Sequence, residues 1–233
     1  AQAGLGRRLA GALHGLVESA REEGFALTSA AMGRRRLKNT ALGYLAHGVP
    51  DDVRAPICTQ ARAATNMTDR LAALALVARW QWPERGAVLE AFYRDFKDEP
   101  LVVNKWFAVQ AMAEHPDVVE EVEGLLQHPA FTLANPNRVR SVLGVFAGFN
   151  PRGFHRRDGA GYRLVTDVTL ELDGRNPAVA ARLAKSFDRW RRFDPVRQRL
   201  MREQLERLAG TEGLSRDLYE IVHKSLQAGD AAA

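Results

Sequence analysis

Apolar residues recur along this chain at intervals of three and four positions, the spacing of one face of an α-helix. In the stretch from 118 to 126 they are Val118, Val119, Val122, Leu125 and Leu126. The same spacing appears between 102 and 112 and again between 218 and 226. The run from 164 to 170 is the best candidate for a strand, yet its flanks fit a helix equally well. The pattern therefore predicts an all-α fold.

Prolines and capping residues indicate where the helices begin. Asn176 precedes Pro177 and Asp194 precedes Pro195, which places a side-chain acceptor at the N-cap and a proline at the first helical position. Ser215 is a third predicted cap. The predicted helical segments are 5–22, 34–47, 51–65, 68–80, 84–96, 100–114, 117–127, 137–148, 160–174, 177–192, 195–209 and 215–227.

About twelve helices joined by short connections describe either a compact bundle or a stack of helix pairs. Because no strict sequence repeat is visible, we favour an irregular superhelical array of antiparallel helix pairs, similar in layout to HEAT or armadillo repeats. We expect residues 1–233 to form a single all-helical domain. Six aromatic residues are predicted to pack between helix pairs rather than to stack on bases: Trp80, Trp82, Phe92, Tyr93, Trp106 and Phe107.

Composition narrows the class of protein. Of the 233 residues, 46% are hydrophobic and 26% are charged, which is ordinary for a globular domain. No apolar run approaches the roughly 18 to 20 residues that span a bilayer, so no membrane partner is expected. The single Cys58 excludes an internal disulfide framework and predicts a reducing, cytoplasmic location. The opening residues AQAG lack an initiator Met, so we expect a piece of a longer chain.

The chain is basic, with a formal net charge of +5 and a pI near 9.7, and most of its basic residues are arginine. An arginine excess can reflect recognition of phosphate or carboxylate, because the guanidinium binds planar anions through two parallel hydrogen bonds. It can equally reflect a preference for arginine codons. The densest run, Arg34 to Arg36, fits the solvated start of a helix at least as well as a nucleic-acid patch.

No catalytic apparatus is visible in the sequence. The six histidines include no pair at helical spacing for one metal ion, and there is no Gly-x-Ser-x-Gly elbow or phosphate loop. Cys58 is predicted to be a small buried residue rather than a nucleophile. Asp158 is predicted to cap the helix that follows it rather than to bind calcium. We therefore predict no catalytic residue, metal ligand or cofactor within this chain.

Several strings, in order along the chain, resemble the C-terminal helical domain of bacterial aminopeptidase N, a family of zinc metallo-aminopeptidases of the gluzincin type. They are NMTDRLAAL (66–74), NKWFAVQA (104–111), GLLQHPAFTLANPNRVRS (124–141), FAGFNP (146–151), FHRRDGAGY (154–162), RNPAVAARL (175–183) and LSRDLYEIVHKSL (214–226). The resemblance implies a hydrolase that removes N-terminal residues from peptides. It also implies that the zinc ion and its ligands lie in a catalytic domain outside this chain.

The resemblance further implies that this chain is the C-terminal domain, which caps the catalytic cleft, lines an internal cavity and controls the access of short peptides. Its partners would be the catalytic and N-terminal domains of its own parent chain. Two cavity arginines of the family correspond to Arg140 in NPNRVRS and Arg182 in RNPAVAARL, where a guanidinium would bind a peptide carboxylate. Ala178 occupies a position where relatives can carry glutamine, so that hydrogen bond is absent here.

Two other functions compete with this interpretation. One is a stand-alone helical-repeat scaffold that binds acidic peptides in its groove and has no enzymatic parent. The other is a basic nucleic-acid-binding protein, and the scatter of arginines between apolar positions argues against it. Unless the helix array presents them to a groove, the arginines are best interpreted as surface salt bridges worth under about 1 kcal/mol each.

Overall fold

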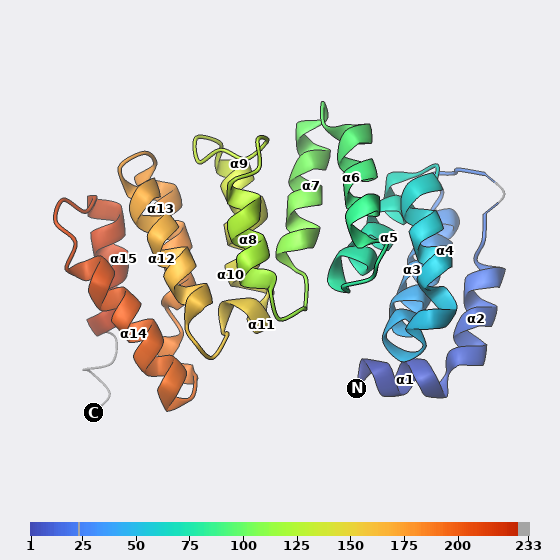
Figure 1. Cartoon of the computed structure of the whole chain (residues 1–233), viewed down its shortest axis with the longest axis horizontal. Helices are drawn as coiled ribbons and strands as arrows, with labels where there is room; N and C mark the ends of the chain where they lie inside the picture. The colour runs from blue at the N-terminus through green and yellow to red at the C-terminus, as the bar shows by residue number, and fades with distance from the viewer. Residues whose placement is uncertain (23, 228–233) are drawn as a thin grey trace. The chain divides into compact units, whose positions relative to one another are not determined.

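The computed structural model describes residues 1–22 and 24–227, and within them every regular element is a helix, which confirms the all-α prediction. The α-helices are labelled α1 to α15 in Figure 1. The stretch from 164 to 170, the candidate strand, lies inside α12 (Ala160–Asp173). None of the helices in the described part is both long enough and apolar enough to span a bilayer.

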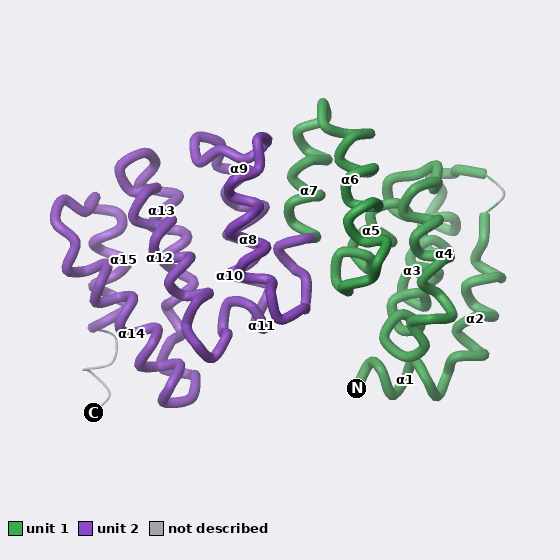
Figure 2. The backbone as a smooth tube through the Cα atoms, viewed as in Figure 1, with its two compact units in different colours: residues 1–109 green, residues 110–233 purple. Residues whose placement is uncertain are grey.

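The chain divides into two compact units, Ala1–Val109 and Gln110–Ala233, shown in green and purple in Figure 2. Each unit is described by itself below. The expectation that residues 1–233 form a single domain stays a prediction.

Unit 1 is a stack in which helices pack on near neighbours in the sequence, as α3 does on α4 and α5 and as α4 does on α5 and α6. Such contacts bury one apolar stripe per helix between consecutive neighbours, as in helical repeats. Its helices are α1 (Gln2–Arg8), α2 (Ala10–Ser19), α3 (Ser29–Gly48), α4 (Pro50–Ala63), α5 (Met67–Arg79), α6 (Arg85–Phe96) and α7 (Pro100–Ala111), the last of which crosses the unit boundary.

The first predicted helix, 5–22, is wrong as a single element, because it is broken at Leu9 into α1 and α2. Both pieces pack on α3, which one straight helix could not do along its whole length. The approach of α1 to α3 is very close: a Cβ on Gly6 would lie 2.1 Å from the Tyr44 carbonyl oxygen, and one on Gly48 would lie 2.4 Å from the Gly6 carbonyl carbon. Only glycine, whose side chain is a single hydrogen atom, fits at these two positions of the crossing.

The predicted start of the next helix at Arg34 is also wrong, because α3 begins at Ser29, where Thr28 accepts a hydrogen bond from the Ala31 amide. Arg35 is not solvated, since its side chain is only 3% exposed. Its Nη1 donates to the Glu22 carboxylate at 2.7 Å and its Nη2 to the Ala26 carbonyl oxygen at 2.9 Å. A buried guanidinium is stable only with such partners, and here they attach the segment before α3 to the helix itself.

Asp69 holds α3, α4 and α5 together through a buried polar network. Its carboxylate accepts hydrogen bonds from Lys38 at 2.7 Å, Asn39 at 2.8 Å and Asn66 at 3.1 Å, and Gln60 donates to Asn39 and to the Asp69 carbonyl. Burial acts to raise the pKa of Asp69, but these hydrogen bonds outweigh it and hold the pKa below its ordinary value. Asp69 of the NMTDRLAAL string is thus a structural residue that connects three helices.

The predicted aromatic core is confirmed at Phe92, Trp106 and Phe107, which are at most 6% exposed. The Trp106 indole donates to the Leu89 carbonyl oxygen at 2.9 Å, so its polar atom is satisfied inside the unit. Trp80, Trp82 and Tyr93 are only half-buried.

Unit 2 repeats the same manner of packing, since α12 contacts α13 and α14, and α15 contacts α13 and α14. The predicted caps are confirmed: Asn176 accepts from the Val179 amide at 3.2 Å, Asp194 from the Arg197 amide at 3.2 Å, and Ser215 from the Leu218 amide at 3.2 Å. Its helices are α8 (Val118–Leu126), α9 (Pro136–Val139), α10 (Val145–Phe149), α11 (Pro151–Phe154), α12, α13 (Pro177–Ala184), α14 (Pro195–Ala209) and α15 (Arg216–Gln227).

Two predicted helices of unit 2 are wrong as continuous α-helices. The segment 137–148 is interrupted by a π-helical turn at Arg140–Gly144, between α9 and α10. The segment 177–192 leaves the α-helix at Ala184 and continues as two 3₁₀ turns, Lys185–Phe187 and Trp190–Arg192. The short helix α11 was not predicted; it starts at Pro151, and Asn150 caps it by accepting from the Gly153 amide at 2.9 Å.

The crossing of α1 and α3 provides a stability test. We expect Gly48→Ala to lower the free energy of unfolding by about 1–3 kcal/mol, because the added Cβ must push α1 away. Gly43→Ala is the matched control in the same helix: nothing lies within 4 Å of its added Cβ. Its higher helix propensity should leave stability unchanged or raise it by up to about 1 kcal/mol. Urea titrations followed by circular dichroism measure both; equal effects would contradict the close crossing.

Candidate functional site

Unit 2 contains a hollow of about 540 Å³ between the α9–α10 segment and α13. Its walls are largely apolar, and its charged side chains are all cationic. The lining residues are Pro136, Val139, Arg140, Gly144, Val145, Ala147, Gly148, Phe149, Val179, Arg182, Leu183, Lys185 and Ser186.

The two arginines singled out from the sequence, Arg140 and Arg182, both line this hollow, although they are 42 positions apart in the chain. Arg140 opens the π turn and Arg182 lies in the last turn of α13. The structure therefore brings the two predicted residues to one place. Their role toward a peptide stays a prediction.

The π turn explains why Arg140 is exposed in an otherwise buried stretch. Its neighbours Arg138 and Val139 on one side, and Ser141 to Leu143 on the other, are at most 8% exposed, whereas Arg140 is exposed. A π turn holds one more residue than an α turn, so it widens the helix and changes which positions face outward. Arg138 is thus part of the scaffold, and Arg140 is the residue presented to the hollow.

Local contacts hold the Arg140 side chain along the helix surface. Its Nη1 donates to the Asn137 side-chain oxygen at 3.0 Å. A Cβ on Gly144 would lie only 3.3 Å from the Arg140 Cγ, so the missing side chain at 144 leaves room for the arginine stem. Asn137 itself is positioned by Asn135, which accepts from its amide at 3.0 Å. The NPNRVRS string therefore contains both the cap and the orienting partner of Arg140.

Lys185 is the functional candidate that sequence reasoning missed. It lies three positions after Arg182 and lines the same hollow. Residues three apart on a helix share a face, so the sequence already placed Lys185 beside Arg182. The sequence does not show, however, which face of the predicted helix 177–192 meets a cavity. Ala178, in contrast, is exposed and does not line the hollow.

The electrostatic balance of the hollow is one-sided. Among the residues that the structure describes, the side chains of Arg182 and Lys185 make no hydrogen bond or ion pair, and the Arg140 side chain has only the neutral Asn137 as a partner. No carboxylate from the described part of the chain lines the hollow. Positive side chains above apolar walls suit an anion attached to an apolar group, such as the C-terminal end of a peptide.

Elsewhere the described residues show no group of three side chains from His, Cys, Asp and Glu that could hold a metal ion. Cys58 is 3% exposed, which confirms the prediction of a small buried residue. Burial raises the pKa of its thiol, and the nearby Glu84 carboxylate acts in the same direction. A thiol protonated in this way is a poor nucleophile.

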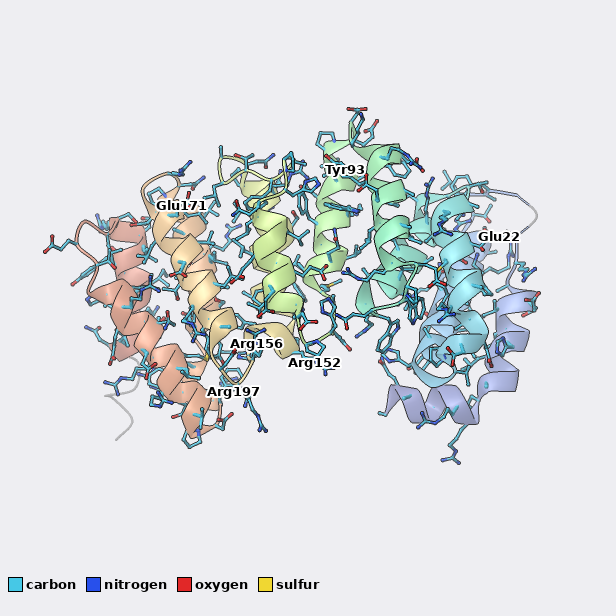
Figure 3. The ribbon with its side chains drawn as sticks, in the orientation of Figure 1. Glu22, Tyr93, Arg152, Arg156, Glu171 and Arg197 are labelled. Carbon is cyan, nitrogen blue, oxygen red and sulfur yellow. The ribbon has the colours of Figure 1, made fainter. Side chains whose placement is uncertain are left out.

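The FHRRDGAGY string spans the connection from α11 to α12. Ion pairs of Arg156, which is labelled in Figure 3, hold this connection in place. Arg156 pairs with Glu120 of α8 at 2.8 Å and with Asp158 at 3.0 Å. Asp158 does not cap α12 as predicted: Gly159, with φ of 72°, occupies the N-cap, and Asp158 accepts from the Ala160 amide at 3.1 Å. The left-handed backbone that Gly159 supplies ends the turn.

His155 lies in the same connection and is half-buried among aromatic rings. Its Nδ1 is 2.8 Å from the Tyr162 hydroxyl, and its ring centroid is 4.1 Å from that of Phe193. Arg197, also labelled in Figure 3, donates to the His155 carbonyl oxygen at 2.9 Å. Burial, followed by the Arg197 charge, lowers the pKa of His155 to about 4, and burial raises the pKa of Tyr162 to about 12. Both groups are therefore neutral and structural near pH 7.

Comparison with known proteins gives a consistent result. Residues 1–227 match the model of a family described as a domain of unknown function (DUF3458_C) with ARM repeats. The chain is 43% identical over 195 residues to aminopeptidase N of Escherichia coli (strain K12), covering 84% of this chain and 22% of that protein. It is 40% identical over 214 residues to aminopeptidase N of Caulobacter vibrioides, covering 92% of this chain and 25% of that protein.

Among solved structures, the chain matches the crystal structure of Legionella pneumophila aminopeptidase A in complex with aspartic acid. The TM-score is 0.89 at 32% identity, with 97% of this chain and 28% of that chain covered. The chain thus spans about a quarter of the length of the curated relatives it matches.

The His155 cluster predicts a pH dependence. Because the folded pKa of about 4 lies below the ordinary 6.5, the unfolded chain binds a proton between these values that the folded chain does not. The free energy of unfolding should therefore fall as the pH drops from about 6.5 to about 4. His155→Asn keeps a hydrogen-bonding group near Tyr162 but removes the titration, so its unfolding energy should fall less over this range. Urea titrations at several pH values measure the difference; parallel curves would contradict it.

Proposed function

Because this chain belongs to the DUF3458_C family of ARM-repeat domains, the C-terminal domain of bacterial aminopeptidase N, we propose that it serves a zinc-dependent aminopeptidase that removes N-terminal residues from peptides. In this proposal the chain caps the catalytic cleft, lines an internal cavity and binds the C-terminal end of short peptide substrates. The lone, buried Cys58 supports a cytoplasmic location for the enzyme.

The observation that carries the proposal is the hollow that joins Arg140 and Arg182. A peptide held by its N-terminus at a distant zinc ion leaves its C-terminal carboxylate to be bound elsewhere, and a guanidinium is the side chain best suited to it. Neither arginine has an acidic partner among the described residues, so neither must break an ion pair to bind a carboxylate. The apolar walls would accept the last side chain of the peptide.

The zinc ion of the proposed enzyme does not fit this chain. The described residues contain no group of three metal-ligating side chains, and the match covers only 22% of the Escherichia coli relative, so most of that relative lies outside the matched part. We therefore assign zinc and its chemistry to that remainder. What this chain contributes is positioning and electrostatic attraction.

The remainder of the parent chain is also the partner we propose for an exposed apolar surface of unit 1. Large exposed apolar side chains concentrate on α1, α2, α3 and the connection before α3, where neighbouring helices leave them uncovered. They are Leu5, Leu9, Leu16, Phe25, Leu27, Met32 and Leu37. Surfaces of this kind commonly mark interfaces, and the catalytic and N-terminal domains are available in the same chain.

The division of labour predicts that the isolated chain is inactive. The purified 233-residue chain should fold into helices yet hydrolyse no alanyl-anilide substrate, even with added zinc. Circular dichroism reports the fold and release of the chromophore reports activity. Turnover that a chelator abolishes would show that the chain carries its own catalytic site and would overturn the proposal.

The hollow predicts a substrate-dependent effect of its arginines in the full-length enzyme. Arg140→Ala and Arg182→Ala should each raise KM for tri- and tetrapeptides by about threefold to tenfold, because each loses a charge-assisted hydrogen bond in a solvated site. KM for a single-residue anilide should change little, since that substrate has no C-terminal carboxylate to bind.

Arg199→Ala is the matched control, because Arg199 pairs with Glu203 on α14 and does not line the hollow. It should leave KM for both substrate types near the wild-type values. Equal increases for peptide and anilide in the Arg140 and Arg182 variants would indicate a structural role instead.

A further inference from the structure

We propose that Lys185 makes the hollow selective for peptides whose last residue is acidic, so that it binds two carboxylates, the terminal one and that of the side chain. The inference rests on the proposed function and deepens it, since it concerns the substrate class of the same site. It starts from the charge balance of the hollow: three cationic side chains and no carboxylate.

A single carboxylate would not balance this charge. One guanidinium binds both oxygens of a carboxylate through its two parallel N–H groups, which leaves the other cations of the hollow without an anion. A terminal aspartate or glutamate carries its second carboxylate only a few bonds from the first. Arg182 and Lys185, three positions apart, present their charges from the same side of the helix end, which suits two neighbouring anions.

The lack of acidic partners distinguishes the hollow from α14 of the same unit. On α14, arginines are paired with carboxylates at short distance, as in Arg199–Glu203 at 2.7 Å, Arg202–Glu206 at 2.7 Å and Arg207–Asp167 at 2.6 Å. A lysine or arginine in the hollow has no such neighbour among the described residues. The positive charge at the hollow is thus left available for a ligand.

The hydroxyl group that lines the hollow is already used in a hydrogen bond within the protein. Ser186 is the only hydroxyl residue lining it, and its Oγ donates to the Leu183 carbonyl oxygen at 2.8 Å. That hydrogen bond satisfies a carbonyl at the end of α13. An incoming carboxylate is therefore bound by Arg140, Arg182 and Lys185, and Lys185 supplies the charge in excess of what one carboxylate requires.

Lys185 also has a local role that the test must separate. A lysine after the last turn of a helix interacts favourably with the C-terminal carbonyls of that helix, whatever the ligand. Loss of this interaction would lower stability and would affect all substrates alike. A preference between two substrates that differ only in one charge isolates the proposed role.

The experiment uses the full-length aminopeptidase and two tripeptides of the same shape, Ala-Ala-Glu and Ala-Ala-Gln. The measured quantity is the ratio of kcat/KM for the two, at low and at high ionic strength. The wild type should favour Ala-Ala-Glu by about threefold to tenfold at low salt, mainly through KM, and by less at high salt because the exposed charges are screened.

Lys185→Gln should bring this ratio close to one, Lys185→Glu should invert it, and Lys185→Arg should restore it. Lys224→Gln, on α15 and outside the hollow, should keep the wild-type ratio. Thermal unfolding of each variant records any structural loss, which cancels in the ratio. A wild type without preference, or a Lys185→Gln variant with the full preference, would overturn the inference.

The same measurements separate this inference from the proposed function. If Arg140→Ala and Arg182→Ala raise KM for both tripeptides while Lys185→Gln leaves the ratio unchanged, the proposed function holds and the inference is overturned. If Lys185→Gln removes the preference while the arginine variants leave both KM values unchanged, Lys185 binds the acidic side chain and the proposed role of the arginines fails.

Discussion

The burial of one apolar stripe per helix is the constraint on which both units depend. No helix can cover its own stripe, so helices pack on near neighbours in the sequence, as α3, α4 and α5 do in unit 1 and α12, α13 and α15 do in unit 2. Each fully buried leucine or valine contributes about 1.5–3 kcal/mol to this stacking. Because the stripes occupy one side of each helix, polar and charged residues lie on the other faces, at the helix ends and in the connections. Arg140, Arg182 and Lys185 all lie at such ends.

Arginine performs three different tasks in this chain, and only the surroundings distinguish them. Arg35 is buried and, through Glu22 and Ala26, fastens a connection to a helix. Arg156 and the arginines of α14 form ion pairs with carboxylates, which in water contribute little individually. Arg140 and Arg182 face a hollow without carboxylates. The arginine excess is therefore neither a simple compositional bias nor one continuous binding surface.

The hollow is also consistent with a domain that contributes charge rather than chemistry. His155, Tyr162 and Cys58 have pKa values that keep them neutral near pH 7, and their contacts are structural. Arg140, Arg182 and Lys185, which have no acidic partner among the described residues, line one hollow with apolar walls. The chain spans about a quarter of its relatives, and in the proposed function the reactive groups belong to the remainder of the parent protein.

The sequence by itself determined the helical class, most helix boundaries and the caps at Asn176, Asp194 and Ser215, because these depend on local spacing and on hydrogen bonds within a few residues. The family strings also singled out Arg140 and Arg182. Only the tertiary structure shows that α1 and α2 separate at Leu9. The break accompanies the close crossing of α1 and α3 at Gly6 and Gly48.

Tertiary packing likewise decided the π turn, the burial of Arg35 and the position of Lys185. Each depends on which face of a helix meets a neighbour and which meets a cavity. Periodicity places residues on a common face of their own helix, but it does not state what lies opposite that face. The opposing surface comes from residues distant in the chain. Its position explains why Lys185 lines the hollow.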